Sequence, residues 1–264
     1  MAVTLEGGCR VSDMREGVAI EHGTLRVWTQ VGRGTGAQAI SLRVLEFAPG
    51  ISPGIRNEEC DEILYVLERQ NEQENSREGT QSCTIFIDGW PLALSARTGI
   101  YLRPRQTFTV ENCGDEPVVL ISSRCPDPDD TSNAFVSPLT SPASSSPPSA
   151  GFVRFADRRA QPTADRWYRV LVDDEVGSTQ VTQFVGSIPP GRAPDHFHQY
   201  EEVLFILRGT GRMWAGETNT PIAAGSCVFL PKRLVHCVEN TGAGELRLLG
   251  VFYPAGSPSV RYES

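Results

Sequence analysis

Short segments rich in β-branched and aromatic residues recur along the whole chain, and Gly, Pro, Asn and Asp separate them. The clearest of these segments are residues 63–67, 84–87, 118–122, 203–207, 227–230 and 246–252. No stretch of the sequence keeps a long apolar period of 3.6 residues, which an amphipathic helix requires. Short strands punctuated by turn residues are typical of β-sandwiches and β-barrels. The pattern therefore predicts an all-β protein.

The two halves of the chain resemble each other. Residues 50–68 read GISPGIRNEECDEILYVLE, residues 191–208 read GRAPDHFHQYEEVLFILR, and Glu62 then corresponds to Glu202. A glycine, a proline and an asparagine follow in each half: Gly99, Pro104 and Asn112, then Gly225, Pro231 and Asn240. A repeat of about 140 residues predicts two tandem domains of one fold.

We predict domains at residues 1–126 and 151–264, joined by residues 127–150. The joining segment is rich in Ser, Pro and Asp, a composition that cannot bury a core, and it is interpreted as a linker. Residues 69–82 are polar and charged. We interpret them as a surface loop, with a lid over a neighbouring pocket as the alternative.

Three of the four histidines lie in the second half, at His196, His198 and His236. Side chains alternate faces along a strand, so His196 and His198 point the same way, and Glu202 shares their parity. His236 must come from another strand folded over the same pocket. Imidazole and carboxylate together suit a divalent first-row transition metal. We therefore predict one metal site with His196, His198, Glu202 and His236 as ligands and with open positions for water, oxygen or substrate.

These residues also carry a family resemblance. The order Gly191, His196, His198, Glu202 and Gly209 is similar to the first motif of the cupin superfamily, and the order Gly225, Pro231, His236 and Asn240 is similar to the second. The resemblance implies two jelly-roll β-barrels packed together, the bicupin arrangement. Two departures are visible: the gap between Gly191 and His196 is one residue short, and Arg233 stands where the second motif usually has glycine. The latter suggests a different turn at Arg233.

The N-terminal copy keeps the scaffold and lacks the imidazoles. Arg56 and Glu58 take the places of the first two histidines, and Phe108 or Thr109 takes that of His236. We expect this degenerate barrel to be metal-free, with Arg56 forming an ion pair with Glu58 and Glu62 in place of a metal.

Other residues near the motifs have weaker claims. Arg212 is our first choice to neutralise an anionic substrate, ahead of Arg192 and Arg233, because it shares the parity of Glu202; a solvent-facing arginine is the alternative. Asp195 either orients a ligand histidine or is a plain loop carboxylate. Glu201 has the opposite parity to Glu202 and is expected to be solvated. The residues expected to line the barrel are Phe205, Ile206, Leu230, Val238 and Phe252.

Composition excludes several classes of function. The net charge is −8 and no block of Lys or Arg occurs, which argues against nucleic-acid binding. No apolar run is long enough for a membrane-spanning helix, and the first residues do not resemble a signal peptide, so the expected location is the cytoplasm. Seven scattered cysteines without a CxxC pair are expected to be reduced thiols.

The function that these features favour is a metal-dependent enzyme that acts on a small oxygenated or acidic organic molecule. Non-haem dioxygenase chemistry at manganese or iron is our first hypothesis, with zinc, nickel or copper as other metals. Glu202 is a candidate base as well as a ligand, and Arg212 a candidate substrate anchor. A redox-neutral decarboxylase, isomerase or lyase and a non-enzymatic binding protein are the alternatives, because fold alone cannot choose among them. A homodimer through exposed strands stays open.

Overall fold

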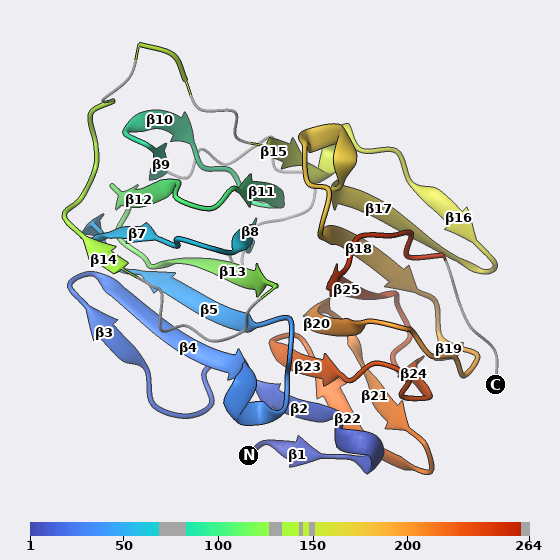
Figure 1. Ribbon diagram of the computed structural model, residues 1–264. Coiled ribbons are helices and arrows are strands. Elements are labelled where there is room, and N and C mark those ends of the chain that lie inside the picture. Colours follow the sequence, from blue (N-terminus) through green and yellow to red (C-terminus); the bar gives the residue numbers. More distant parts are fainter. Residues whose placement is uncertain (69–82, 127–133, 143–144, 148–150, 260–264) are drawn as a thin grey trace.

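The computed structural model describes residues 1–68, 83–126, 134–142, 145–147 and 151–259 (Figure 1). Within these residues the regular secondary structure is almost entirely β-strand, as predicted, with short 3-10 turns at η1 (Glu6–Gly8), η2 (Arg33–Thr35), η4 (Phe155–Asp157) and η5 (Asp174–Val176). No helix in the described part of the chain is long and apolar enough to span a membrane. The loop predicted at residues 69–82 lies outside the described residues.

The N-terminal barrel consists of two antiparallel sheets. The larger has the order β15 (Gly151–Arg154), β11 (Thr98–Leu102), β8 (Asp61–Val66), β13 (Val118–Cys125), β5 (Leu42–Phe47), β4 (Leu25–Val31) and β3 (Ile20–His22). The smaller has the order β10 (Trp90–Ala93), β9 (Cys83–Ile87), β12 (Thr107–Asn112), β7 (Gly54–Arg56) and β14 (Ala134–Val136), with β6 (Gly50–Ile51) paired to β12. Apolar side chains of both sheets, among them Leu64, Ile85 and Phe108, fill the space between them.

The C-terminal barrel repeats this architecture. Its larger sheet has the order β1 (Val3–Thr4), β2 (Arg10–Asp13), β23 (Ser226–Leu230), β20 (Glu201–Arg208), β25 (Leu246–Tyr253), β18 (Thr182–Ile188), β17 (Arg166–Val172) and β16 (Gln161–Thr163). Its smaller sheet has the order β19 (Gly191–Arg192), β24 (His236–Asn240), β21 (Thr210–Ala215) and β22 (Thr218–Ala223). The two barrels are the tandem jelly-roll units that the repeat predicts.

The first strands of each predicted domain pair with the other barrel. Strands β1 and β2 precede every strand of the N-terminal barrel, yet β2 pairs with β23 in the C-terminal sheet (Figure 1). In return, β15 pairs with β11 in the N-terminal sheet. Strand β14 pairs with β7, so part of the segment interpreted as a linker is a strand of the N-terminal barrel. The domain limits 1–126, 127–150 and 151–264 stay a prediction, and the strand pairing adds these exchanges to them.

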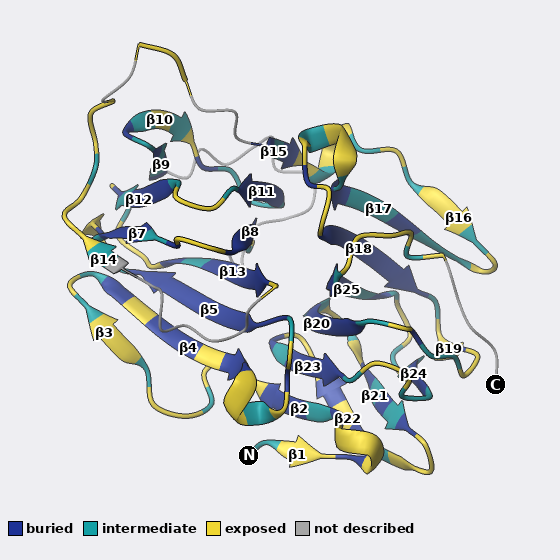
Figure 2. Cartoon of the chain, in the orientation of Figure 1, coloured by how far each residue is buried: buried dark blue, intermediate teal, exposed yellow. Residues whose placement is uncertain are grey.

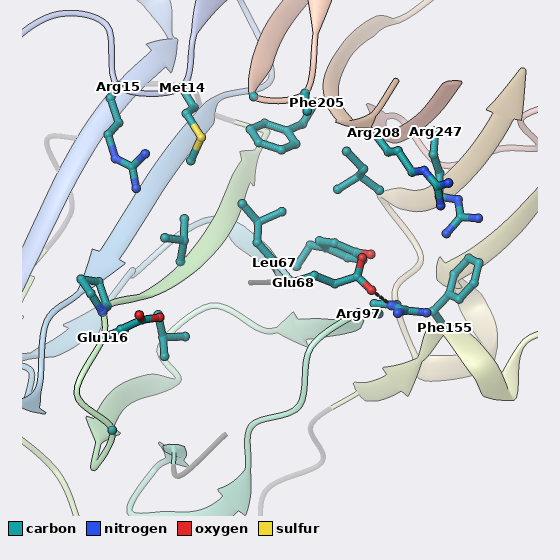
Figure 3. Close-up of a pocket in the computed structure, with 18 of the residues that line it drawn as sticks. Met14, Arg15, Leu67, Glu68, Arg97, Glu116, Phe155, Phe205, Arg208 and Arg247 are labelled. Carbon is teal, nitrogen blue, oxygen red and sulfur yellow. Dashed lines mark ion pairs between the residues drawn. The ribbon is translucent and has the colours of Figure 1, made fainter. Parts of the chain in front are cut away.

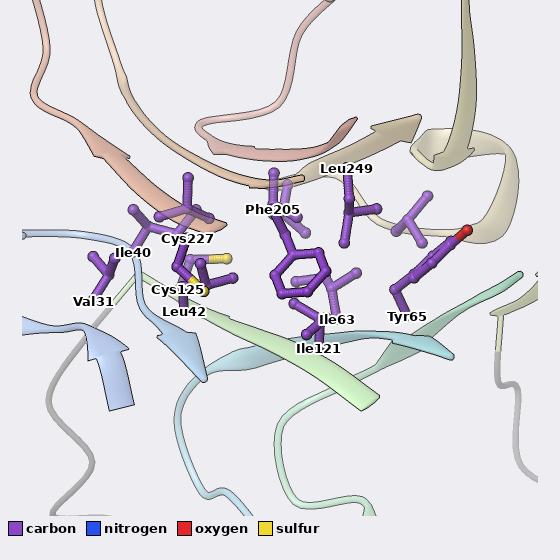
Figure 4. Packing of buried hydrophobic residues seen from close by; sticks show 14 of the residues in the cluster. Val31, Ile40, Leu42, Ile63, Tyr65, Ile121, Cys125, Phe205, Cys227 and Leu249 are labelled. Carbon is purple, nitrogen blue, oxygen red and sulfur yellow. The ribbon is translucent and has the colours of Figure 1, made fainter. Parts of the chain in front are cut away.

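Strand β20 lies between the barrels and is buried on both faces, as the dark colouring of its ribbon shows (Figure 2). Leu204 and Ile206 point into the C-terminal barrel. Val203 and Phe205 point the other way, and Phe205 packs near Ile63 and Ile121 of the N-terminal barrel (Figure 4). The expectation that Phe205 lines its own barrel is therefore wrong, whereas Ile206, Leu230, Val238 and Phe252 do belong to that core.

A cavity of about 980 Å³ also lies between the barrels (Figure 3). Its lining combines apolar side chains such as Leu67 and Phe205 with Arg208, Arg247 and the ion pair between Arg97 and Glu68. The cavity contains no histidine and is separate from the histidine cluster described below.

Glu201 connects the barrels by hydrogen bonds. Its carboxylate accepts the backbone N–H groups of Gln38, at 2.8 Å, and of Ala39, at 2.7 Å. The residue is only 5% exposed, so the expectation of a solvated side chain is wrong. Its parity points it toward the N-terminal barrel, as for Val203 and Phe205, and the backbone amides there replace water.

We predict that Glu201→Ala lowers the free energy of unfolding by about 2 kcal/mol, because hydrogen bonds to a charged group are lost. Urea unfolding followed by circular dichroism measures this change. The matched control is Glu59→Ala, which removes an exposed carboxylate and should change stability by less than about 0.5 kcal/mol. Equal stability of the two variants would contradict the role given to Glu201.

Candidate metal centre

The structure brings the three predicted histidines together. His196 and His236 face each other across an antiparallel bridge, in which each backbone N–H donates to the other residue's carbonyl oxygen, at 3.1 and 2.9 Å. His198 follows two residues later, on the side of His196 that alternation predicts. One nitrogen from each ring lies within 4.8 Å of the others. This cluster is the arrangement that can hold a metal ion.

Backbone carbonyl groups fix two of the rings. Nδ1 of His196 lies 3.0 Å from the carbonyl oxygen of Pro194, and Nδ1 of His236 lies 2.8 Å from that of Leu234. A carbonyl oxygen only accepts, so each Nδ1 carries the hydrogen and each Nε2 keeps its lone pair. Burial, followed by the neighbouring His196, lowers the pKa of His236 to about 3. His236 is therefore neutral, the form that binds metals.

Glu202 lies beside the cluster. Its Oε2 is 3.5 Å from Nε2 of His198, and its side chain is almost fully buried. Burial raises the pKa of Glu202 to about 8, so at neutral pH this carboxyl carries a proton while no cation is near. A divalent ion would favour the charged form. Glu202 is not within the 4.8 Å group that the three imidazoles form, but it is the nearest carboxyl to it on β20.

A stack of aromatic rings holds His198. The His198 ring lies parallel to that of Tyr200, with centroids 4.8 Å apart, and Tyr200 in turn stacks on Phe252 at 4.5 Å. Such stacks restrict the rotation of the middle rings. Tyr200 is therefore a positioning residue for His198, and it also lines the pocket beside the histidines.

The donor set fits a divalent first-row ion. Three neutral imidazoles and a carboxylate are the ligand types that manganese, iron and zinc accept. Nitrogens bound tetrahedrally to one ion at about 2.1 Å lie about 3.4 Å apart, so the rings, now within 4.8 Å of one another, need to approach by up to about 1.4 Å. The backbone bridge between His196 and His236 already fixes the backbone positions from which two of the three rings extend.

A small cavity of about 100 Å³ opens beside these residues. Its walls are mainly apolar and come from strands outside the two motifs: Trp167 and Tyr168 of β17, Phe184 and Ile188 of β18, and Leu248 of β25. The sequence analysis did not identify these residues. The alternating apolar positions of β18 and β25 carry a signal for burial, but nothing in it distinguishes a pocket wall from a core.

The structure does not bring Arg212 to this site. Met213 and Ala215 on the same strand are buried in the barrel core, so Arg212 projects from the opposite face of β21. Its guanidinium donates to Oδ1 of Asn219 at 2.5 Å, and Arg212 does not line the pocket. The turn between β20 and β21 reset the parity on which this prediction depended.

The other polar candidates also lie outside the pocket. Asp195 forms an exposed ion pair with Arg192 at 3.1 Å, and the partner of His196 is a backbone carbonyl instead. Glu239 accepts a hydrogen bond from Nε1 of Trp214 at 2.8 Å and does not line the pocket.

Arg233 adopts the left-handed conformation, with φ of 66°, and its N–H donates to the carbonyl of His198 at 2.6 Å. Arg105 does the same in the N-terminal barrel, with φ of 71° and a 2.6 Å bond to the carbonyl of Asn57. Arginine here takes the backbone conformation that glycine adopts easily, at a cost of about 1 kcal/mol, and the different turn expected at Arg233 stays a prediction. The equivalent turns at Arg105 and Arg233 therefore define which residues of the two barrels correspond to each other.

By this register the metal positions of the N-terminal barrel differ from those inferred from sequence. Asn57 corresponds to His198. Phe108 pairs with Ile55 as His236 pairs with His196. The three histidine places are thus taken by Ile55, Asn57 and Phe108, one residue earlier than the predicted Arg56 and Glu58, and that assignment is corrected.

Glu62 keeps the place of Glu202 but has different partners. Arg43 lies 2.6 Å and Arg124 lies 3.1 Å from its carboxylate, and all three side chains are buried. The ion pair predicted between Arg56 and Glu62 is absent from the described contacts; Arg56 pairs with the exposed Glu58 instead. Burial alone would raise the pKa of Glu62, but the two arginines and Ser122 lower it below its ordinary value.

Residues 184–252 match the family model of the cupin domain. Auxin-binding protein 1 of Arabidopsis thaliana is 32% identical over 83 residues, which are 28% of this chain and 42% of that protein. The chain thus spans less than half of this curated relative. The family match covers the second barrel, and the first barrel repeats the architecture of the second.

Solved structures share the whole two-barrel fold at low identity. A putative glyoxylate-induced protein from Pseudomonas aeruginosa has a TM-score of 0.71 and 16% identity, and the match covers 96% of this chain and 91% of that one. Oxalate decarboxylase of Bacillus subtilis, which has Mn(II) centres, has a TM-score of 0.71 and 11% identity, with 94% and 78% covered. These likenesses establish the fold alone.

We predict that metal binding at pH 7 releases the proton of Glu202. Because its pKa is about 8 in the metal-free protein, metal affinity should rise about fivefold between pH 7 and 8 and about twofold more above pH 8, levelling off near pH 9. Titration calorimetry with Zn²⁺ in buffers of different ionisation enthalpy counts the protons. Glu202→Gln should abolish the slope, and an unchanged slope in that variant would contradict the assignment.

Proposed function

We propose that this protein is a metal-dependent enzyme in which His196, His198, Glu202 and His236 hold one divalent ion, manganese or iron before zinc, nickel or copper. The observation that carries the proposal is the histidine cluster, which places one nitrogen from each of three rings within 4.8 Å of the others, beside a buried carboxyl. The substrate class that we infer is a small oxygenated or acidic organic molecule, because a hard oxygen ligand can fill the open positions of such an ion.

Several of the chain's own residues would shape the reaction. Glu202 gives up its proton when the ion binds and can hold a proton again once displaced from it. Tyr200 holds the plane of His198 and turns one edge of its ring to the pocket. The apolar walls exclude water, which strengthens each electrostatic interaction inside. The ion itself would supply Lewis acidity and, for iron or manganese, a redox couple for use with dioxygen.

Oxygenase chemistry stays our first choice of reaction. A redox-neutral decarboxylation or isomerisation needs an acid or base besides the ligands. Among the described residues that line the pocket, Glu202 is the single carboxyl, and the further titratable candidates are the tyrosines. Tyr200 favours the redox-neutral alternative, because that reaction needs a further acid or base. The fold shared with oxalate decarboxylase also favours it. A non-enzymatic binding protein is the third candidate, and a complete donor set argues against it.

We predict that the protein purified without added metal contains close to one manganese or iron per chain, and that His198→Ala loses it. Mass spectrometry of the metal content measures this, with circular dichroism to verify folding. The matched control is His22→Ala, which removes the fourth histidine, a residue that stacks on Phe135 far along the chain from the cluster. Equal metal content in both variants would refute the proposed centre.

The choice between reactions needs a second measurement. Turnover of a panel of small carboxylic acids should stop when dioxygen is removed, because an oxygenase consumes it. Oxygen uptake with an electrode, beside product analysis under argon, tests this. Unchanged turnover under argon would replace the oxygenase by the redox-neutral reaction, and the absence of turnover with a fully loaded protein would favour the binding protein.

A further inference from the structure

We propose that the pocket of this centre accepts a monocarboxylate with a short apolar tail and discriminates against small dicarboxylates. This inference rests on the proposed function, because it assumes that a carboxylate binds the ion held by the histidines. It assigns the rest of the ligand to the wall formed by β17, β18 and β25.

Much of the pocket lining is apolar, with side chains from β18, β20, β24 and β25. Phe184, Leu204, Val238 and Leu248 line the cavity, and each is at most 9% exposed. A ligand that enters between these side chains gains by burying apolar surface, and a charged group placed there loses its hydration.

The two barrels differ at the equivalent positions. In the N-terminal barrel Arg124 pairs with Glu62, and Ser122 pairs with Arg43. In the C-terminal barrel the same register gives Phe252 opposite Glu202 and Gly250 opposite Phe184. Two arginines and a serine are therefore replaced by two phenylalanines and a glycine, so the scaffold that holds buried cations in one barrel presents an uncharged surface in the other.

Gly250 allows this surface to form. A Cβ atom added there would lie 2.3 Å from Cε1 of Phe184, closer than any side chain can approach. The ring of Phe184 thus lies directly over the backbone of β25, and a larger residue at position 250 would force it to move. The glycine and the phenylalanine together define one side of the cavity.

One cation does line the pocket. Arg166 lies at the hairpin between β16 and β17, and its Nε is 2.9 Å from Oδ1 of Asp165. The neighbouring Asp165 carboxylate therefore already compensates part of the charge of this guanidinium, which weakens its attraction for a second carboxylate. The small cavity, about 100 Å³, also limits the buried part of the ligand to a few carbon atoms.

The test uses the zinc-loaded full chain and three probes: acetate, butyrate and succinate. Butyrate and succinate have the same length and differ in one end group, methyl or carboxylate. Titration calorimetry should give butyrate an affinity about fifteenfold above that of acetate, from about fourfold for each of two methylenes. Succinate should bind more than about tenfold more weakly than butyrate, because its second charge lies against the apolar wall.

Two variants locate the effect. Phe184→Leu should weaken butyrate about fivefold and leave acetate unchanged, because only the longer ligand reaches the ring. The matched control is Phe205→Leu, a buried phenylalanine on β20 that faces the other barrel, and it should leave both affinities unchanged. The wild-type series decides the inference by itself if a variant does not fold.

The possible results distinguish failure of this inference from failure of the proposed function. Failure of the wild-type protein to bind zinc would refute the proposed metal centre. Stoichiometric zinc with succinate equal to or tighter than butyrate would overturn the inference alone and would identify Arg166 as the group that receives the second carboxylate.

Discussion

The alternation of side chains along β20 is the constraint on which the rest of this molecule depends. The strand lies between the barrels, and each of its faces has a separate task. One face carries Glu201 to the amides of residues 38 and 39 and Phe205 to the core between the barrels. The other carries Glu202 to the histidines and Leu204 to the pocket wall. A slip of one residue would exchange these faces and destroy both.

The two barrels bury a carboxyl group at the same place in the fold and surround it differently. Burying a charge is costly unless it is paired. In the N-terminal barrel two buried arginines surround Glu62 and hold its pKa below the ordinary value. In the C-terminal barrel, Glu202 lies beside His198, and burial raises its pKa to about 8. Within the described part of the chain no arginine pairs with this carboxyl, and a bound cation would compensate its charge.

The same substitution shapes the pocket. Long cationic side chains at positions equivalent to Phe184 and Phe252 would fill the barrel and impose charge on it, as Arg43 and Arg124 do in the other half. Aromatic rings at these positions leave a small, mainly apolar cavity and support the ring stack that holds His198. The replacement of two arginines by two phenylalanines on a common scaffold therefore distinguishes the N-terminal barrel, which is filled, from the C-terminal barrel, which has an open pocket.

The sequence by itself determined the β architecture, the repeat and the histidine set, because these depend on local period and on motif spacing, which are written in consecutive residues. It failed wherever a turn or a bulge shifts the register: Arg212 left the site, and Ile55 and Asn57 replaced Arg56 and Glu58 as the equivalents of the histidines. Only the tertiary structure decided that Glu201 is buried, that β2 and β15 exchange barrels, and that Phe184 and Leu248 form the pocket wall. These features depend on which distant strands become neighbours, and a single strand carries no record of its partner.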